Sequence, residues 1–183
     1  MLDDSNFTGS RFDNANLSSS SLDDSVFKGA SLVKTDMTRA SARDSVFEDA
    51  DMTKSEGYRA EFDGSVLRNT NLTKSEYLRA SFRDAEISDV DWSKSELGRV
   101  NFTDAELTRV SFEFSNLSRV MFKDAELDGV NFRGAYTYLT RFEDVDLRQV
   151  ENLSQLQLEL ACGNEQTKLP EGRVMPEGWP CSE

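Results

Sequence analysis

Carboxylate side chains recur in pairs at a fixed spacing along the second half of the chain. In each pair two acidic residues stand two positions apart, and successive pairs begin twenty residues apart: Asp84 and Glu86, Asp104 and Glu106, Asp124 and Glu126, Asp144 and Asp146. Two neighbouring carboxylates could serve as a general acid and a general base. A repetition this regular is more typical of a surface ladder, so we interpret these residues as a candidate protein-binding acidic edge.

Other residue types that support catalysis are scarce. The sequence contains no histidine, which excludes triads and metal sites built on imidazole. It also lacks a glycine-rich phosphate loop, and a flat column of aspartates offers too few converging oxygens for calcium. We therefore predict no catalytic residue, no cofactor and no metal site, and we do not expect an enzyme.

A five-residue period determines where these carboxylates lie. The segment FKDAELDGVNFRGA, residues 122–135, has large side chains at Phe122, Leu127 and Phe132. Every fifth position from 7 to 147 is large with three exceptions, and a series of Ala, Ser, Thr or Val stands two residues before each; the exceptions are Ala42, Gly57 and Thr137. One large and one small residue in every five would point inward, a self-repeating pattern that indicates a solenoid.

A second period of twenty residues groups the fives into coils. It is visible when KSEGYRAEF (54–62), KSEYLRASF (74–82) and KSELGRVNF (94–102) are aligned. Four fives would form one square coil, so that residues twenty apart stack at the strand spacing of about 4.8 Å. Residues 5–150 would then form about seven coils. The core of such a rod is a thin column, which suits a hydrophobic content of only 37%.

The repeating unit resembles that of a known family. Its pattern is a small residue, then Asp, Asn or Glu, then Leu or Phe, then two variable positions, as in ADMTK, TNLTK, AELTR and VNFRG. This is similar to the pentapeptide-repeat family, which implies an all-β fold, the right-handed quadrilateral β-helix. We expect one repeat domain at residues 5–150, followed by a C-terminal capping helix and a proline-containing tail at 151–183.

Charge and the resemblance together suggest the function. A formal net charge of −13 argues against direct binding of nucleic acid or of an anionic membrane surface, because both are polyanions. We expect a protein-binding or scaffold module. The resemblance implies an alternative, because some family members mimic DNA, occupy the DNA site of type II topoisomerases and protect against quinolones. The partner would then be DNA gyrase or topoisomerase IV. Loops are important in several of those proteins, whereas no loop interrupts the fives here.

Two further edges of the expected rod carry stacked cations. Lysines recur at one corner with acids two residues later, and arginines recur at another corner: Lys34, Lys54, Lys74 and Lys94; Asp36, Glu56, Glu76 and Glu96; Arg39, Arg59, Arg79, Arg99 and Arg119. Stripes of opposite sign would offset the repulsion within each stripe. We expect a lattice of solvated salt bridges, each contributing about 0–1 kcal/mol.

The five-residue rule stops after Val150, and residues 152–163, NLSQLQLELACG, have the pattern of a short helix. Ser154 with Gln157 fits a capping box, and Gly163 fits the C′ position. Leu156 and Leu160 would share one face and cover the last coil. No apolar run is long enough to span a membrane, so we expect no membrane insertion.

Two cysteines leave the redox state and the compartment open. Cys162 and Cys181 could form a disulfide, which would suit a periplasmic or secreted protein with a structural role in the envelope. They could instead be free thiols in a cytoplasmic protein, the compartment expected for a topoisomerase-directed function. The segment ACGNEQTKLPEG and the later WPC resemble tails of some bacterial pentapeptide-repeat proteins, which favours the disulfide.

Several outward positions near the end of the repeats are unexpectedly apolar: Phe114, Tyr136, Tyr138 and Leu139. The tail, anchored by Trp179, would cover this patch. Alternatively, the patch is a dimer contact, because some members of the family dimerise through C-terminal helices. The chain is therefore expected to be a monomer or a C-terminal-mediated homodimer.

Overall fold

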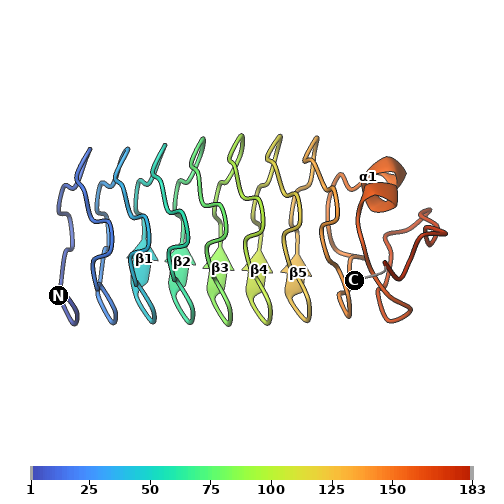
Figure 1. Cartoon of the computed structure of the whole chain (residues 1–183), viewed down its shortest axis with the longest axis horizontal. Helices are drawn as coiled ribbons and strands as arrows, with labels where there is room; N and C mark the ends of the chain where they lie inside the picture. The colour runs from blue at the N-terminus through green and yellow to red at the C-terminus, as the bar shows by residue number, and fades with distance from the viewer. Residues whose placement is uncertain (1, 182–183) are drawn as a thin grey trace.

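The molecule is a rod of stacked coils with a helix and a folded tail at its C-terminal end (Figure 1). This computed structural model describes residues 2–181, so the last two residues of the expected tail lie outside the description. Parallel pairs join residues twenty positions apart in every repeat coil. One column of such pairs runs Asn6, Val26, Val46, Val66, Glu86, Glu106, Glu126.

The regular strands all belong to one side of the square. They are β1 Val46–Glu48, β2 Val66–Arg68, β3 Glu86–Ser88, β4 Glu106–Thr108 and β5 Glu126–Asp128, and they form a parallel sheet in the order β1-β2-β3-β4-β5. Isolated parallel bridges hold the other three sides in the same register, for example Arg11↔Ser31, Asn16↔Asp36 and Ser21↔Ser41. The expected all-β quadrilateral β-helix is confirmed.

Each side of the square ends in a turn whose third residue has a left-handed backbone. The φ angle is 59° at Asp104, 57° at Phe114 and 58° at Arg119. A turn of type II needs positive φ at its third residue, and residues other than glycine adopt it uncommonly. Because corners recur every twenty residues, side chains of one kind stack along much of three corners, where the runs of aspartate, lysine and arginine are exposed.

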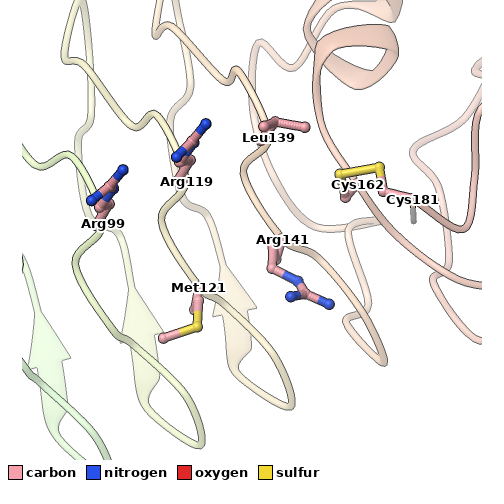
Figure 2. A pocket seen from close by; sticks show the side chains of 7 residues that line it. All are labelled: Arg99, Arg119, Met121, Leu139, Arg141, Cys162 and Cys181. Atoms are coloured by element: carbon pink, nitrogen blue, oxygen red, sulfur yellow. A yellow bond between two sulfur atoms is a disulfide. The ribbon is translucent and has the colours of Figure 1, made fainter. Parts of the chain in front are cut away.

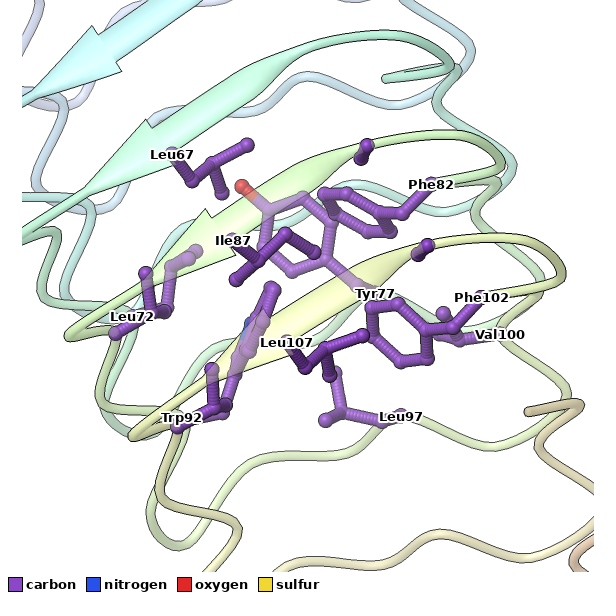
Figure 3. Close-up of a cluster of buried hydrophobic side chains, with 14 of the residues drawn as sticks. Leu67, Leu72, Tyr77, Phe82, Ile87, Trp92, Leu97, Val100, Phe102 and Leu107 are labelled. Carbon is purple, nitrogen blue, oxygen red and sulfur yellow. The ribbon is translucent and has the colours of Figure 1, made fainter. Parts of the chain in front are cut away.

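Stacked aromatic rings fill much of the core. The rings of Phe62, Phe82, Phe102, Phe122 and Phe142 succeed one another along one side, with centroids 4.8 to 5.5 Å apart and nearly parallel planes except for a 23° tilt between Phe82 and Phe102. Figure 3 shows Phe82 and Phe102 together with Trp92, whose ring meets both edge-on. Offset-stacked and edge-on pairs are the favourable geometries for aromatic rings, so the ladder stabilises the register as well as the core.

Buried hydroxyl groups join the coils at the small inward positions. Ser45 Oγ donates to Leu22 O (2.8 Å), Thr70 Oγ1 to Phe47 O (2.7 Å), and Ser115 Oγ to Trp92 O (2.8 Å). Each acceptor lies 23 residues earlier in the preceding coil. These bonds satisfy hydroxyls that burial would otherwise penalise.

The C-terminal end is closed by helix α1, Gln155–Leu160. The capping box between Ser154 and Gln157 is confirmed, because each side chain bonds the other residue's backbone N–H. The expected burial of Leu156 and Leu160 is wrong, since they are 67% and 36% exposed. The buried residues of the helix are instead Gln157 and Leu158. None of the described helices is long and apolar enough to cross a membrane.

Gly163 has a different role from the one expected of it. The helix ends with Ala161 as its C-cap in an extended conformation, so Gly163 is not at C′. Instead, Trp179 packs directly on Gly163, where a Cβ would lie 2.2 Å from the ring atom Cζ3. The indole Nε1 donates to Ala161 O at 2.7 Å. The glycine is therefore required by the close approach of the ring.

Coil pairing continues beyond the helix. Cys162 forms a bridge with Arg141, and Lys168 with Asp146, while a disulfide joins Cys162 to Cys181. The segment after α1 thus lies against the last coil, and the disulfide attaches the end of the tail to it. The domain boundary at residue 150 stays a prediction.

Candidate functional site

The acidic edge is built by the register of the sheet. Glu86, Glu106 and Glu126 begin β3, β4 and β5 and are direct partners, Glu86↔Glu106 and Glu106↔Glu126. The aspartates two residues earlier occupy the left-handed corner, and a buried alanine separates each aspartate from its glutamate: Asp84, Asp104 and Asp124; Ala85, Ala105 and Ala125. The structure therefore brings six exposed carboxylates together along three coils.

Cations compensate only part of this charge. Arg68 contacts Glu86 at 3.0 Å, Arg83 contacts Asp104 at 3.9 Å and Lys123 contacts Asp124 at 3.6 Å. Asp84, Glu106 and Glu126 form no ion pair with any residue in the range 2–181. Exposed pairs contribute little, about 0–1 kcal/mol, so the carboxylates of this edge are available to a partner.

The far end of the edge is occupied by the tail. Asp146 binds Arg148 Nη2 at 2.6 Å and Lys168 Nζ at 3.4 Å, and the hydrogen bond from Arg148 lowers the pKa of its carboxyl below the ordinary aspartate value. Asp144 Oδ1 accepts a hydrogen bond from Asn164 Nδ2 at 3.1 Å. The two aspartates predicted to extend the edge therefore contact the C-terminal segment, although Asp144 is still exposed. The part of the edge without such contacts runs from Asp84 to Glu126.

The carboxylates of the acidic edge lie in a line along the rod and do not converge on one point. Across the described chain no group of three or more His, Cys, Asp or Glu side chains converges as metal ligands would. Parallel strands repeat at about 4.8 Å, so each coil adds one Asp–Glu pair at that step. Such a line can dock on a basic surface, since opposite charges attract each other.

The apolar patch is not covered by the tail. Phe114, Tyr136 and Tyr138 are 58%, 50% and 42% exposed, and the two tyrosine rings stack with centroids 6.2 Å apart. Leu139 is half-buried, and its backbone N–H donates to Leu160 O at 2.7 Å. Trp179 anchors the tail on Gly163 instead. The tail-docking interpretation is wrong for the three aromatic residues, and the dimer contact stays a prediction.

The salt-bridge lattice expected on the other two edges is absent from the described residues. None of the stacked lysines from Lys34 to Lys94, and none of the stacked arginines from Arg39 to Arg119, has a carboxylate oxygen within 4.0 Å in residues 2–181. Left-handed corners hold these side chains outward. Ion pairs form instead along other columns, such as Lys28–Glu48 at 3.0 Å.

Sequence reasoning missed a hollow beside the arginine corner (Figure 2). Its wall includes the disulfide between Cys162 and Cys181, whose redox state the sequence left open. A signal did exist, because the arginine corner gives way to Leu139 just after Arg119, and Met121 interrupts an otherwise polar column.

Three solved structures illustrate what this chain is similar to. A trypsin-treated variant of QnrB1, a plasmid-mediated fluoroquinolone resistance protein, superposes with a TM-score of 0.74 at 20% identity, over 93% of this chain and 89% of that one. HetL, a pentapeptide repeat protein involved in heterocyst differentiation regulation in Nostoc sp. strain PCC 7120, shares 19% identity over 97% of this chain and 87% of its own, with a TM-score of 0.40.

A pentapeptide repeat protein of the Arabidopsis thaliana thylakoid lumen is 30% identical over 62% of this chain and 74% of its own, with a TM-score of 0.37. No curated protein sequence matches significantly. The family model for pentapeptide repeats matches eight copies, within residues 2–39, 20–56 and 95–134. These matches cover more than half of the chain, and together with the observed β-helix they show that it belongs to the pentapeptide-repeat family.

Proposed function

We propose that this protein is a non-enzymatic binding module that docks through its acidic edge on the basic surface of a partner protein. The observation that carries the proposal is the register Glu86↔Glu106↔Glu126 with an aspartate at each preceding corner. The stacking makes one continuous negative line on a stiff rod. Because the backbone is already ordered, binding has to immobilise only the acidic side chains.

A comparison within the molecule supports the choice of this edge. Glu56, Glu76 and Glu96 form a second exposed column in the same kind of register. Lysines, not aspartates, occupy the corners two residues before them. The first column therefore concentrates negative charge, whereas the second alternates with cations.

A type II topoisomerase, DNA gyrase or topoisomerase IV, is the candidate partner. A groove that normally holds duplex DNA meets phosphates at about 3.4 Å per strand, and the edge offers one pair of carboxylates about every 4.8 Å. The overall likeness to QnrB1, a fluoroquinolone resistance protein, favours this partner. A sequence identity of 20% supports a shared fold only. The functional argument therefore rests on the acidic edge.

A structural role in an oxidising compartment is the second candidate. The observation in its favour is the Cys162–Cys181 disulfide, because such bonds persist mainly in secreted and periplasmic proteins. A topoisomerase-directed protein would meet its partner in the cytoplasm, where thiols are kept reduced. Determining the thiol state of the protein isolated from its native compartment distinguishes the two candidates.

The test of the first candidate is a supercoiling assay with purified gyrase, with and without a quinolone. We expect the protein to inhibit supercoiling or to protect the enzyme from the drug, and we expect added salt to weaken the effect by screening. The triple variant Glu86→Lys, Glu106→Lys, Glu126→Lys should lose the effect. Its matched control is Glu56→Lys, Glu76→Lys, Glu96→Lys, which changes the net charge equally.

Each outcome of the assay has a definite meaning. Loss in the first triple variant alone supports docking through the acidic edge. Equal loss in both variants would show that total charge, not this edge, governs the interaction. Activity that survives the first triple variant would refute the acidic edge as the docking site. No effect of the wild-type protein on gyrase would remove that enzyme as the partner, and a pull-down from the native compartment would follow.

A further inference from the structure

A hollow of about 530 Å³ lies beside the disulfide at the C-terminal end of the rod (Figure 2). Three arginines, Arg99, Arg119 and Arg141, stand around it. Its apolar part is formed by Met121, Leu139 and the Cys162–Cys181 disulfide. The volume falls within the range of about 300–1,000 Å³ that is typical of small-molecule sites.

Two of the arginines form no ion pair with any carboxylate in the described part of the chain. Arg99 and Arg119 occupy successive left-handed corners, with φ of 63° and 58°, and both are exposed. Within residues 2–181 neither has a carboxylate within 4.0 Å, whereas Arg141 Nε bonds Glu143 Oε1 at 2.8 Å. Stacked guanidinium groups repel one another. An anion placed between Arg99 and Arg119 would relieve that repulsion.

The apolar part of the hollow lies where the arginine corner ends, after Arg119. The corner runs from Arg39 to Arg119 in steps of twenty and then becomes Leu139. The neighbouring column carries Ser81 and Asn101 before Met121. The backbone N–H of Leu139 donates to Leu160 O at 2.7 Å, so α1 holds the leucine in place, and the disulfide brings Cys181 against the same wall.

We propose that this hollow binds a small amphipathic organic anion. An aromatic or branched aliphatic body would lie on Met121, Leu139 and the disulfide, and a carboxylate, sulfonate or phosphate group would be held by Arg99 and Arg119. The planar guanidinium fork suits such oxyanions because it donates two parallel hydrogen bonds. This inference is independent of the proposed function, since the acidic edge has no part in it.

The probe is naphthalenesulfonate, titrated calorimetrically into the intact disulfide-bonded protein, with naphthol as the uncharged analogue. We expect the sulfonate to bind about tenfold more tightly than naphthol, the difference expected from charge-assisted hydrogen bonds. The variant Arg99→Gln, Arg119→Gln should weaken sulfonate binding by about tenfold or more. The variant Arg39→Gln, Arg59→Gln is the matched control, because it removes two cations from the same corner away from the hollow.

Three outcomes of these titrations would overturn the proposal. They are absence of sulfonate binding to the wild-type protein, equal affinity for sulfonate and naphthol, and equal weakening by the two arginine variants. A thermal unfolding curve checks that each variant is folded. Met121→Glu is a second test. It replaces a half-buried apolar residue of the hollow with a carboxylate. This carboxylate should repel the sulfonate while leaving the arginines in place. Retained binding in Met121→Glu would also contradict the proposal.

Discussion

Gly57 and Tyr77 are neighbours in one inward column, and the Tyr77 ring occupies the space beside Gly57. A Cβ on Gly57 would lie 2.2 Å from Cε1 of Tyr77 in the next coil, so the ring fills the volume that a leucine or phenylalanine fills elsewhere. The Tyr77 hydroxyl shares a hydrogen bond of 2.8 Å with Ser55 Oγ, and full burial raises the pKa of the phenol. The gap in the five-residue pattern at position 57 is thus compensated by the residue stacked on it.

This compensation predicts strong coupling between the two positions. Gly57→Leu should destabilise the fold by about 1–3 kcal/mol through overpacking, and Tyr77→Leu by a few kcal/mol through the cavity it leaves. The double variant restores a regular leucine pair, so its loss should be smaller than the sum by about 1–3 kcal/mol. Urea unfolding of the four proteins measures the coupling. Additive losses would show that the two side chains do not share one space.

At the scale of elements, α1 is attached to the rod through a buried amide. Gln157 Nε2 donates to Phe132 O at 2.8 Å and to Ala135 O at 2.9 Å, and Thr137 Oγ1 donates to Gln157 O at 2.8 Å. Gln157 stands twenty residues after Thr137. The first turn of the helix therefore takes the next inward position of the coil and satisfies carbonyls that would otherwise be left at the open end.

The hydrogen bonds of the Gln157 amide predict that removing this side chain destabilises the C-terminal end of the rod. Gln157→Ala leaves the carbonyls of Phe132 and Ala135 without this donor, and each buried unsatisfied group costs about 1–3 kcal/mol. Glu159→Ala, on the exposed side of the same helix, should change stability little. Hydrogen exchange at residues 132–140 reports the local effect. Equal protection in the two variants would mean that Gln157 does not hold the last coil.

The ion pair of Asp146 makes the same region sensitive to acid. Arg148 lowers the pKa of the Asp146 carboxyl in the folded state. A depressed folded pKa means that the stabilisation is complete above the unfolded pKa, about 3.9 for aspartate, and is lost as the pH falls through the folded value. Asp146→Asn should therefore be less stable than wild type at neutral pH, and the difference should shrink below about pH 4. A difference that stays constant down to low pH would contradict this assignment.

Helix α1 shows which features could be predicted from the sequence and which could not. The capping box is a local pattern, so Ser154 and Gln157 identify the start of α1. The buried side of the helix is decided by the last coil, because Gln157 must lie over Thr137, and this leaves Leu156 exposed. Continuing the count of twenty through the helix would have found Gln157. The helical spacing of Leu156 and Leu160 predicted the wrong buried residues.

Over the whole molecule, the period predicts backbone register and gives less information about side-chain pairing. Residues twenty apart stack as the repeats require, and the acidic edge from Asp84 to Glu126 follows from that register alone. Side-chain pairing does not follow from this register, since within residues 2–181 Arg99 and Arg119 have no carboxylate oxygen within 4.0 Å, contrary to what the charge pattern suggested. The hollow beside them depends on the tail, whose path follows no period.

A repeat register of twenty residues predicts which insertions the rod tolerates. A second copy of residues 81–100, placed after Val100, should add one coil, lengthen the rod by about 4.8 Å and leave it cooperatively folded, because each coil contacts only its neighbours. A matched insertion of the same segment without Ser81 should shift every later inward residue out of the core and lower the thermal unfolding midpoint sharply. Small-angle scattering measures the length, and circular dichroism the midpoint. Equal midpoints for the two insertions would show that the inward columns do not determine the fold.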